Sequence, residues 1–297
     1  MAPGWTSYKH RLVYRVLDVT DLVRISDQNV FAVEVAEGWY AGRLGVRGGT
    51  RFWYDGKEIA MLAQLEVRLV TTSRPTTWTL NSDSTWLCGP SAILRSEIYD
   101  GETYDMREED PDWKRRDLPA DRAQSFGPTE MIPWPSAQLV LSEAPPVRLV
   151  EQIYAKLSFV TPSGKLIIDF GQNLVGAVRI HSLAMPAAGD KVTLRHAEVM
   201  EHGELGVRPL RSAKCTDVII SDGTTLRDWS PQFTFHGFRY LEVEGYSGPS
   251  RPRLENFTAL VMHSDMERRG YFTCSNALVN KLHENVVWGM KGNFFSI

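Results

Sequence analysis

The sequence has few cysteines, no long apolar run and no excess of either charge. Cys88, Cys215 and Cys274 lie far apart and form no Cys-x-x-Cys pair. This excludes a disulfide-rich scaffold and a cysteine-based zinc or redox motif, but leaves a single disulfide open. No segment approaches the roughly eighteen apolar residues of a membrane span. With 33 basic and 36 acidic side chains, the net charge of -3 excludes a large basic surface for nucleic acid. We expect neither a nucleic acid nor a membrane as a partner.

The start of the chain shows no cationic segment followed by an apolar core, so no signal peptide is visible. A cytoplasmic location is therefore expected, unless the natural N-terminus lies upstream. A length of 297 residues predicts two domains. Aromatic residues are frequent, with nine Trp, ten Tyr and twelve Phe. This composition suits β-rich cores and sugar-binding surfaces alike, and it does not choose between them.

Most of the sequence alternates apolar and polar residues with a period of two, the pattern of half-buried β-strands. In Phe31–Val35 and in Gln64–Leu69, every second residue is apolar. The same alternation predicts strands at Leu166–Phe170, Lys191–Arg195, Arg239–Val243 and Asn256–Val261. Gly, Pro, Asp and Ser separate these segments, and no long helix interrupts them. The chain is therefore predicted to be mainly β, with two antiparallel β-sandwiches instead of a parallel α/β sheet.

A charged and proline-rich stretch divides the two predicted sandwiches. Residues 107–124 are highly charged, and prolines, which cannot donate to a β-ladder, follow them. These are Pro128, Pro133, Pro135, Pro145 and Pro146. We predict a first sandwich over residues 1–130, a Pro-rich linker over 131–146, a second sandwich over 147–267 and a helical segment over 268–297.

The pattern changes near the C-terminus. Tyr271–Ser275 is predicted as a last strand, with Ser275 as the N-cap of a helix that begins at Asn276. One face of this helix is apolar, through Leu278, Val279, Leu282, Val286 and Met290. Such a stripe needs a partner. Either the helix packs back on the preceding sandwich, or it begins a further helical domain, which is the preferred interpretation.

Seven phrases, in the same order along the whole chain, are similar to phrases of one enzyme family. They are Ala2–Tyr8, Gly38–Gly45, Glu97–Asp105, Asp169–Asn173, Arg195–Glu198, Phe233–Tyr240 and Leu282–Gly289. On these phrases the chain resembles the bacterial and fungal α-L-rhamnosidases of glycoside hydrolase family 78. The resemblance implies a jelly-roll-like N-terminal β-sandwich, a second β-sandwich and the first helix of a truncated (α/α)6 barrel.

The resemblance also implies an activity, the inverting hydrolysis of terminal non-reducing α-L-rhamnose residues in rhamnose-containing glycosides. In the family, the general acid and base lie in the barrel, beyond the segment that matches residues 292–297. An inverting pair needs two carboxyls roughly 6.5–9.5 Å apart across a sugar pocket. No acid of this sequence stands in an apolar context that would raise its pKa. We therefore name no catalytic residue, and expect a chain that is truncated at both ends relative to the family and inactive alone. A stand-alone rhamnose-binding β-sandwich protein is the alternative.

Aromatic and basic residues in a glycine-rich segment suggest a carbohydrate surface in the first sandwich. The candidates are Trp39, Tyr40 and Arg43. Aromatic rings pack on the C–H face of a sugar, and a guanidinium donates hydrogen bonds to its hydroxyls. Core packing of both rings, with Arg43 paired to an acid, is an equal alternative. Trp53 and Trp86 are weaker candidates of the same kind.

Four carboxylates occur within nine residues, at Glu97, Asp100, Glu102 and Asp105. Crowded carboxylate oxygens bind Ca²⁺, and the resemblance implies such an ion in the first sandwich of some family members. Asp100, Glu102 and Asp105 are thus candidate calcium ligands. The preferred interpretation is a turn of solvated or capping acids with an ion pair to Arg95 or Arg107, because the spacing lacks the regularity of a calcium loop. No other cofactor is expected.

Three histidines, His196, His202 and His236, are interpreted as structural. No pair has the i, i+4 spacing or the carboxylate companion of a zinc enzyme. His196 alternates with Glu198 on a strand face, and His236 precedes Gly237, where a strand bends, so we expect backbone carbonyls to satisfy both histidines.

Overall fold

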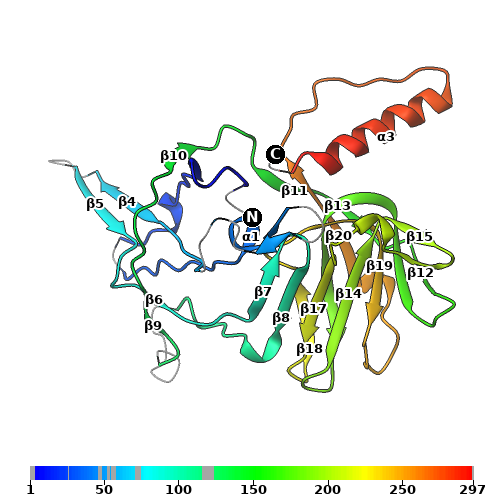
Figure 1. Ribbon diagram of the computed structural model, residues 1–297, viewed down its shortest axis with the longest axis horizontal. Helices are drawn as coiled ribbons and strands as arrows, with labels where there is room; N and C mark the ends of the chain where they lie inside the picture. Colours follow the sequence, from blue (N-terminus) through cyan, green and yellow to red (C-terminus); the bar gives the residue numbers. More distant parts are fainter. Residues whose placement is uncertain are drawn as a thin grey trace.

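The computed structural model describes residues 4–25, 27–45, 49–51, 54, 58–70, 75–115 and 124–295. Within them the chain is mainly β, as predicted, with an N-terminal β domain, a curled β-sandwich and one long C-terminal helix (Figure 1). None of the helices in the described residues has the length and hydropathy required to cross a bilayer.

The N-terminal domain contains short strands joined in pairs. Strand β1 lies parallel to β10, whereas β2 with β3, β4 with β5 and β6 with β9 are antiparallel. The strands are β1 (Arg11–Tyr14), β2 (Arg43–Leu44), β3 (Thr50–Arg51), β4 (Gln64–Leu69), β5 (Thr76–Asn81), β6 (Leu87–Cys88), β9 (Gly127–Pro128) and β10 (Gln138–Leu141). The short helices are η1 (Thr20–Leu22), α1 (Gly38–Ala41) and η2 (Met106–Glu108). The strand predicted at Gln64–Leu69 is therefore confirmed.

A ten-stranded sheet forms the second part of the molecule. Its order is β11-β20-β13-β19-β14-β17-β8-β7, and β12 and β18 also pair with β13. These strands are β7 (Ile93–Glu97), β8 (Gly101–Asp105), β11 (Val147–Tyr154), β12 (Leu157–Val160), β13 (Leu166–Ala184), β14 (Lys191–Ala197), β17 (Thr216–Ile220), β18 (Thr225–Trp229), β19 (His236–Glu244) and β20 (Phe257–Ser264). A separate hairpin joins β15 (Val199–Glu201) to β16 (Glu204–Gly206), and two more short helices are η3 (Arg208–Leu210) and η4 (Leu254–Asn256).

The sheet curls into a sandwich because β13 is long enough to pair with four other strands. It spans nineteen residues, and its register against β19 shifts between Asp169 and Leu174. The predicted alternation then places one row of side chains inside. In β14, for example, Val192 and Leu194 are buried in the core. The largest fully buried rings are Phe170, Phe238 and Phe257.

The hairpin β7–β8 joins this sheet from the N-terminal side of the predicted linker. Strand β8 pairs in parallel with β17, with Thr103 opposite Val218 and Asp105 opposite Ile220. Figure 1 shows the hairpin between the N-terminal domain and the sandwich. The sheet therefore contains residues from both sides of the predicted Pro-rich linker.

Two predicted strands are wrong. Phe31–Val35 and Tyr271–Ser275 form no strand in the structure. Phe31 packs its ring against Trp86 at a centroid distance of 5.2 Å, so part of its apolar surface is buried without a ladder. Residues 265–276 form a long connection that leaves the sandwich (Figure 1) and pairs with none of the described strands. Alternation predicts a strand only where a partner supplies hydrogen bonds.

Helix α3 (Ala277–Asn293) is present at the predicted place, with its N-cap one residue later than predicted. The cap is Asn276, whose side chain accepts hydrogen bonds from the backbone N–H groups of Leu278 and Val279. Asn276, unlike the predicted Ser275, thus satisfies two of the free N–H groups at the helix start.

Within the described residues, α3 contacts the sandwich near its C-terminal end, where Trp288 packs against the core. Just after the helix, Phe295 stacks on Phe235 at a centroid distance of 3.6 Å. The predicted apolar stripe does not lie on the sandwich, because Leu278 is 81% and Leu282 61% exposed. Figure 1 shows the helix projecting away from the sheets.

Candidate functional site

The candidate sugar-binding rings pack against other aromatic rings. Trp39 meets Tyr99 edge to face at 6.0 Å, and Tyr40 stacks on Tyr54 at 6.2 Å. Both Trp39 and Tyr40 are partly buried. The sugar-binding role of Trp39, Tyr40 and Arg43 stays a prediction. The contacts that the two rings make are those of the alternative interpretation, in which both rings pack against other side chains. Of the weaker candidates, Trp53 lies outside the described residues.

Arg43 binds two buried acids, as the alternative interpretation expected. Its backbone N–H donates to Glu97 Oε2 at 3.0 Å, and its guanidinium contacts Glu97 Oε1 at 3.4 Å and also pairs with Asp100. Arg95 and Lys214 add ion pairs to the other Asp100 oxygen, at 3.0 and 3.2 Å. This ionic cluster connects the segment after α1 with the β7–β8 turn and the loop before β17. It holds the N-terminal domain against the sandwich.

Replacing Arg43 with methionine should lower the free energy of unfolding by about 3 kcal/mol, because the Glu97 carboxylate, whose side chain is fully buried, loses its cation. Methionine keeps much of the apolar stem, so the loss reports mainly the charge. The matched control is Arg95→Met, which removes a more exposed cation, at 42% exposure, from the same acid cluster. Its cost should stay below about 1 kcal/mol. Urea unfolding of both variants tests this, and equal losses would contradict the role given to Arg43.

The three candidate calcium ligands do not converge on one point. Asp100 faces the cations of the ionic cluster, and Asp105 binds Arg107 at 2.7 Å. Glu102 turns into the interior, where its Oε2 accepts from the Ser96 hydroxyl. Each carboxylate thus has its own partners, and calcium binding at these residues stays a prediction.

Glu102 corrects one expectation drawn from the sequence. Burial raises its pKa to about 7, and the charge of Asp217 adds to this, so one acid does stand in an environment that favours its neutral form. Its Oε2 also accepts from the backbone N–H groups of Gln232 and Phe233, which acts in the opposite direction. Glu102 is only 1% and Asp217 0% exposed, so no sugar ring can reach between them. We still assign no catalytic residue.

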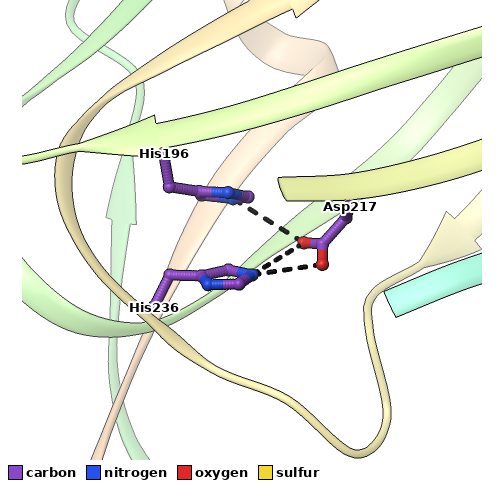
Figure 2. A group of neighbouring side chains, drawn as sticks. All are labelled: His196, Asp217 and His236. Atoms are coloured by element: carbon purple, nitrogen blue, oxygen red, sulfur yellow. Dashed lines mark hydrogen bonds and ion pairs between the residues drawn. The ribbon is translucent and has the colours of Figure 1, made fainter. Parts of the chain in front are cut away.

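Beside Glu102, three inward-facing polar side chains meet: His196 of β14, Asp217 of β17 and His236 of β19 (Figure 2). Each continues a row of buried apolar residues. His196 follows Leu194 on the inner face of its strand, and His236 precedes Phe238. All three are 0–2% exposed. The strand alternation therefore places them inside, although their side chains are polar.

Asp217 was not identified from the sequence as a buried functional candidate. The signal was available, because Asp217 and Ile219 occupy the same face of β17 and Ile219 is fully buried. An acid on an inward row predicts a buried carboxylate, and a buried carboxylate requires a partner. Which partner it finds depends on the order of strands in the sheet.

The two imidazoles differ in their partners. Nδ1 of His196 lies 3.1 Å from the Cys215 carbonyl oxygen, which confirms the expected backbone contact. His236 was expected to bind a carbonyl, but its Nε2 instead contacts both oxygens of Asp217, at 3.1 and 3.2 Å. The rings stack with centroids 4.2 Å apart. His202 lies apart from them in an exposed turn with φ +52°.

Burial and charge separate the pKa values within this group. Burial and the neighbouring His236 lower the pKa of His196, so His196 is neutral near pH 7. Burial alone would lower the pKa of His236 and raise that of Asp217, but their mutual attraction outweighs it and shifts both in favour of the charged forms. The group resembles a buried ion pair with an additional neutral imidazole.

The chain matches three family descriptions along its length. Residues 1–151 match the α-L-rhamnosidase N-terminal domain, and residues 160–263 match the bacterial α-L-rhamnosidase concanavalin-like domain. Residues 267–297 match the bacterial α-L-rhamnosidase 6 hairpin glycosidase domain. The first match alone covers more than half of the chain.

Similar proteins cover the whole chain. An α-L-rhamnosidase of Streptomyces avermitilis is 37% identical over 300 residues, which include 100% of this chain and 28% of that protein. The crystal structure of native α-L-rhamnosidase from Aspergillus terreus has a TM-score of 0.88 at 42% identity, over 100% of this chain and 33% of the other. The Streptomyces avermitilis α-L-rhamnosidase complexed with L-rhamnose has a TM-score of 0.85 at 35% identity, over 100% and 28%. This chain spans about a third or less of the length of these proteins.

Proposed function

This chain belongs to the α-L-rhamnosidase family, and from that membership we propose that it is the N-terminal, non-catalytic portion of such an enzyme. The complete enzyme would hydrolyse terminal non-reducing α-L-rhamnose residues of α-L-rhamnosides by an inverting mechanism. The 297 residues alone would be inactive. Their role would be to support the glycosidase domain and to hold it next to the two β units.

The exposed stripe of α3 is the observation that carries this proposal. The stripe lies within residues 267–297, the part that matches the 6 hairpin glycosidase domain. Its five apolar residues are 40–81% exposed, and in the described residues the helix contacts the sandwich near its C-terminal end, at Trp288. A helix face of this kind is stable in water only when another apolar surface covers it. In the proposal, further helices of the glycosidase domain are that surface.

The proposal is tested by comparing the chain alone with a fusion. The fusion joins residues 1–297 to the C-terminal remainder of the Streptomyces avermitilis relative, in place of that protein's matched segment. On an aryl α-L-rhamnoside the chain alone should give no turnover, and the fusion should be active. Turnover by the chain alone would contradict the proposal. L-rhamnose binding without turnover, in titrations with and without a chelator, would favour the stand-alone rhamnose-binding protein.

Two substitutions in the fusion examine α3 directly. Leu282→Asp places a charge on the stripe, and Lys281→Asp places the same charge next to it. The two positions are similarly exposed in this chain, at 61% for Leu282 and 64% for the Lys281 side chain. Leu282→Asp should reduce the rhamnosidase activity of the fusion at least tenfold, whereas Lys281→Asp should leave it within twofold. Equal activities would show that the stripe does not meet the glycosidase domain.

A further inference from the structure

In the group of His196, Asp217 and His236, both imidazole rings point toward the Asp217 carboxylate (Figure 2). The Nε2 atom of His236 is 3.1 and 3.2 Å from the two Asp217 oxygens, and the Nε2 atom of His196 is 3.8 Å from Oδ2. One donor atom from each residue can be chosen so that all lie within 4.8 Å of one another. Tetrahedral Zn²⁺ with bonds of about 2.0–2.1 Å holds its donors about 3.3 Å apart. The His236–Asp217 separations are close to that spacing, and the His196–Asp217 separation is longer, so binding of an ion would require a small shift of the His196 ring.

His196 presents an atom that its surroundings do not satisfy. Its Nδ1 lies beside the Cys215 carbonyl oxygen, which can only accept, so Nδ1 carries the proton and Nε2 carries the lone pair. This Nε2 is buried and has no hydrogen-bond partner among the residues that the structure describes. It faces the Asp217 carboxylate, which also offers only lone pairs. Two acceptors that face each other in a buried site are unfavourable, and a cation between them would remove the conflict.

The same Cys215 contact is typical of metal sites. A histidine that binds a metal through one ring nitrogen usually donates its other N–H to a carbonyl or carboxylate, which fixes the ring and its tautomer. The Cys215 carbonyl oxygen is that acceptor for the Nδ1–H of His196. Edge-to-face contact with Phe238 at 5.0 Å further restricts that ring. The orientation is therefore set before any ion binds.

We propose that His196, Asp217 and His236 bind one divalent transition-metal ion, with zinc the best match. The two Nε2 atoms and the Asp217 carboxylate would supply three ligands of the type that zinc binds in proteins. The three side chains are 0–2% exposed, so no open position remains for a substrate. The ion would be structural, and would join β14, β17 and β19. Asp217 also accepts a hydrogen bond from the Glu102 backbone N–H of β8 at 2.9 Å. By holding Asp217 in place, the ion would therefore also stabilise the attachment of β8.

Metal analysis of the purified chain tests the proposal. Protein expressed with added zinc, purified without chelator and dialysed against a mild chelator should retain about one zinc per chain by mass spectrometry. Removal of that zinc should require unfolding, and should lower the melting temperature of the refolded chain. Refolding with Co²⁺, followed by dialysis, should give the visible absorption of a tetrahedral cobalt site. Cobalt bound weakly to the surface would be removed by the dialysis and would give no such absorption.

Paired variants separate this site from adventitious binding. His196→Gln should lose the retained zinc, whereas His263→Gln should keep it. His263 is also a buried histidine with a backbone carbonyl contact, but it lies on β20, outside the group. If neither variant folds, the metal content and the chelator response of the unchanged chain decide. A folded chain without retained zinc or cobalt, and with a melting temperature that does not respond to either ion, would identify the group as an ion pair and overturn the proposal.

Discussion

Replacing Gly101 with alanine should lower the free energy of unfolding by about 3 kcal/mol or more. Gly101 begins β8 with φ +108°, a conformation that residues with a side chain rarely adopt. An added Cβ would lie only 2.1 Å from the Thr216 carbonyl oxygen and 2.8 Å from Asp217 Oδ1. Backbone strain and a backbone clash therefore combine at one position. The clash can be relieved only by moving β8 away from β17, the contact that joins the hairpin to the sandwich.

The control for this variant is Gly164→Ala. Gly164 also has a positive φ, of +86°, but an added Cβ there meets no atom of the described residues within 4 Å. Its cost should be backbone strain alone, about 1 kcal/mol. Urea unfolding followed by tryptophan fluorescence compares the two variants. Equal losses would mean that Gly101 does not approach Thr216 closely, and that the hairpin is joined to the sandwich in some other way.

Phe238→Ala should cost about 4 kcal/mol, because it leaves a cavity at the centre of the sandwich. Phe238 is fully buried and meets Phe170 edge to face at 5.6 Å. Its ring also contacts His196, so the cavity would open beside the buried polar group. Surrounding strands cannot close over the space without breaking their ladders, so the expected loss lies within the usual range for a buried phenylalanine.

Phe272→Ala provides the comparison for Phe238. Phe272 is 50% exposed and lies in the long connection before α3. Its removal should change the free energy of unfolding by less than about 0.5 kcal/mol. Thermal and urea unfolding should both show this difference. A similar small loss at Phe238 would show that the ring is not part of a close-packed core.

The strands of the sandwich could be predicted from the alternation of apolar and polar residues wherever another strand pairs with the segment. Lys191–Arg195 and Arg239–Val243 lie within β14 and β19, which pair with each other. Phe31–Val35 alternates just as clearly and forms no strand. Alternation reports only that one side of an extended segment is apolar. It does not report whether another segment arrives beside it, since that depends on distant parts of the chain.

For the group of His196, Asp217 and His236, too, the sequence predicts which way a side chain points but not which residues it meets. Alternation could have placed His196 and Asp217 on inward rows, because each shares a face with buried apolar neighbours. Their meeting with His236 could not be predicted, since it requires β14, β17 and β19 to be adjacent and the sheet to curl. Likewise, the four carboxylates between Glu97 and Asp105 are close in sequence, but only Glu97 and Asp100 share a partner, Arg43, whereas Glu102 and Asp105 bind other groups. Nearness along the chain did not bring all four to one partner.

The sequence by itself determined the mainly β character, the apolar face of α3 and the kinship with rhamnosidases, because each depends on local periodicity or on long ordered phrases. Only the tertiary structure decided that β8 lies beside β17, that Arg43 pairs with Glu97, and that an acid and two histidines meet in the buried interior. The physical reason is that a side chain's direction follows from its own strand, whereas its partners can come from strands more than a hundred residues away along the chain. Those partners are fixed by the total packing of the sheet.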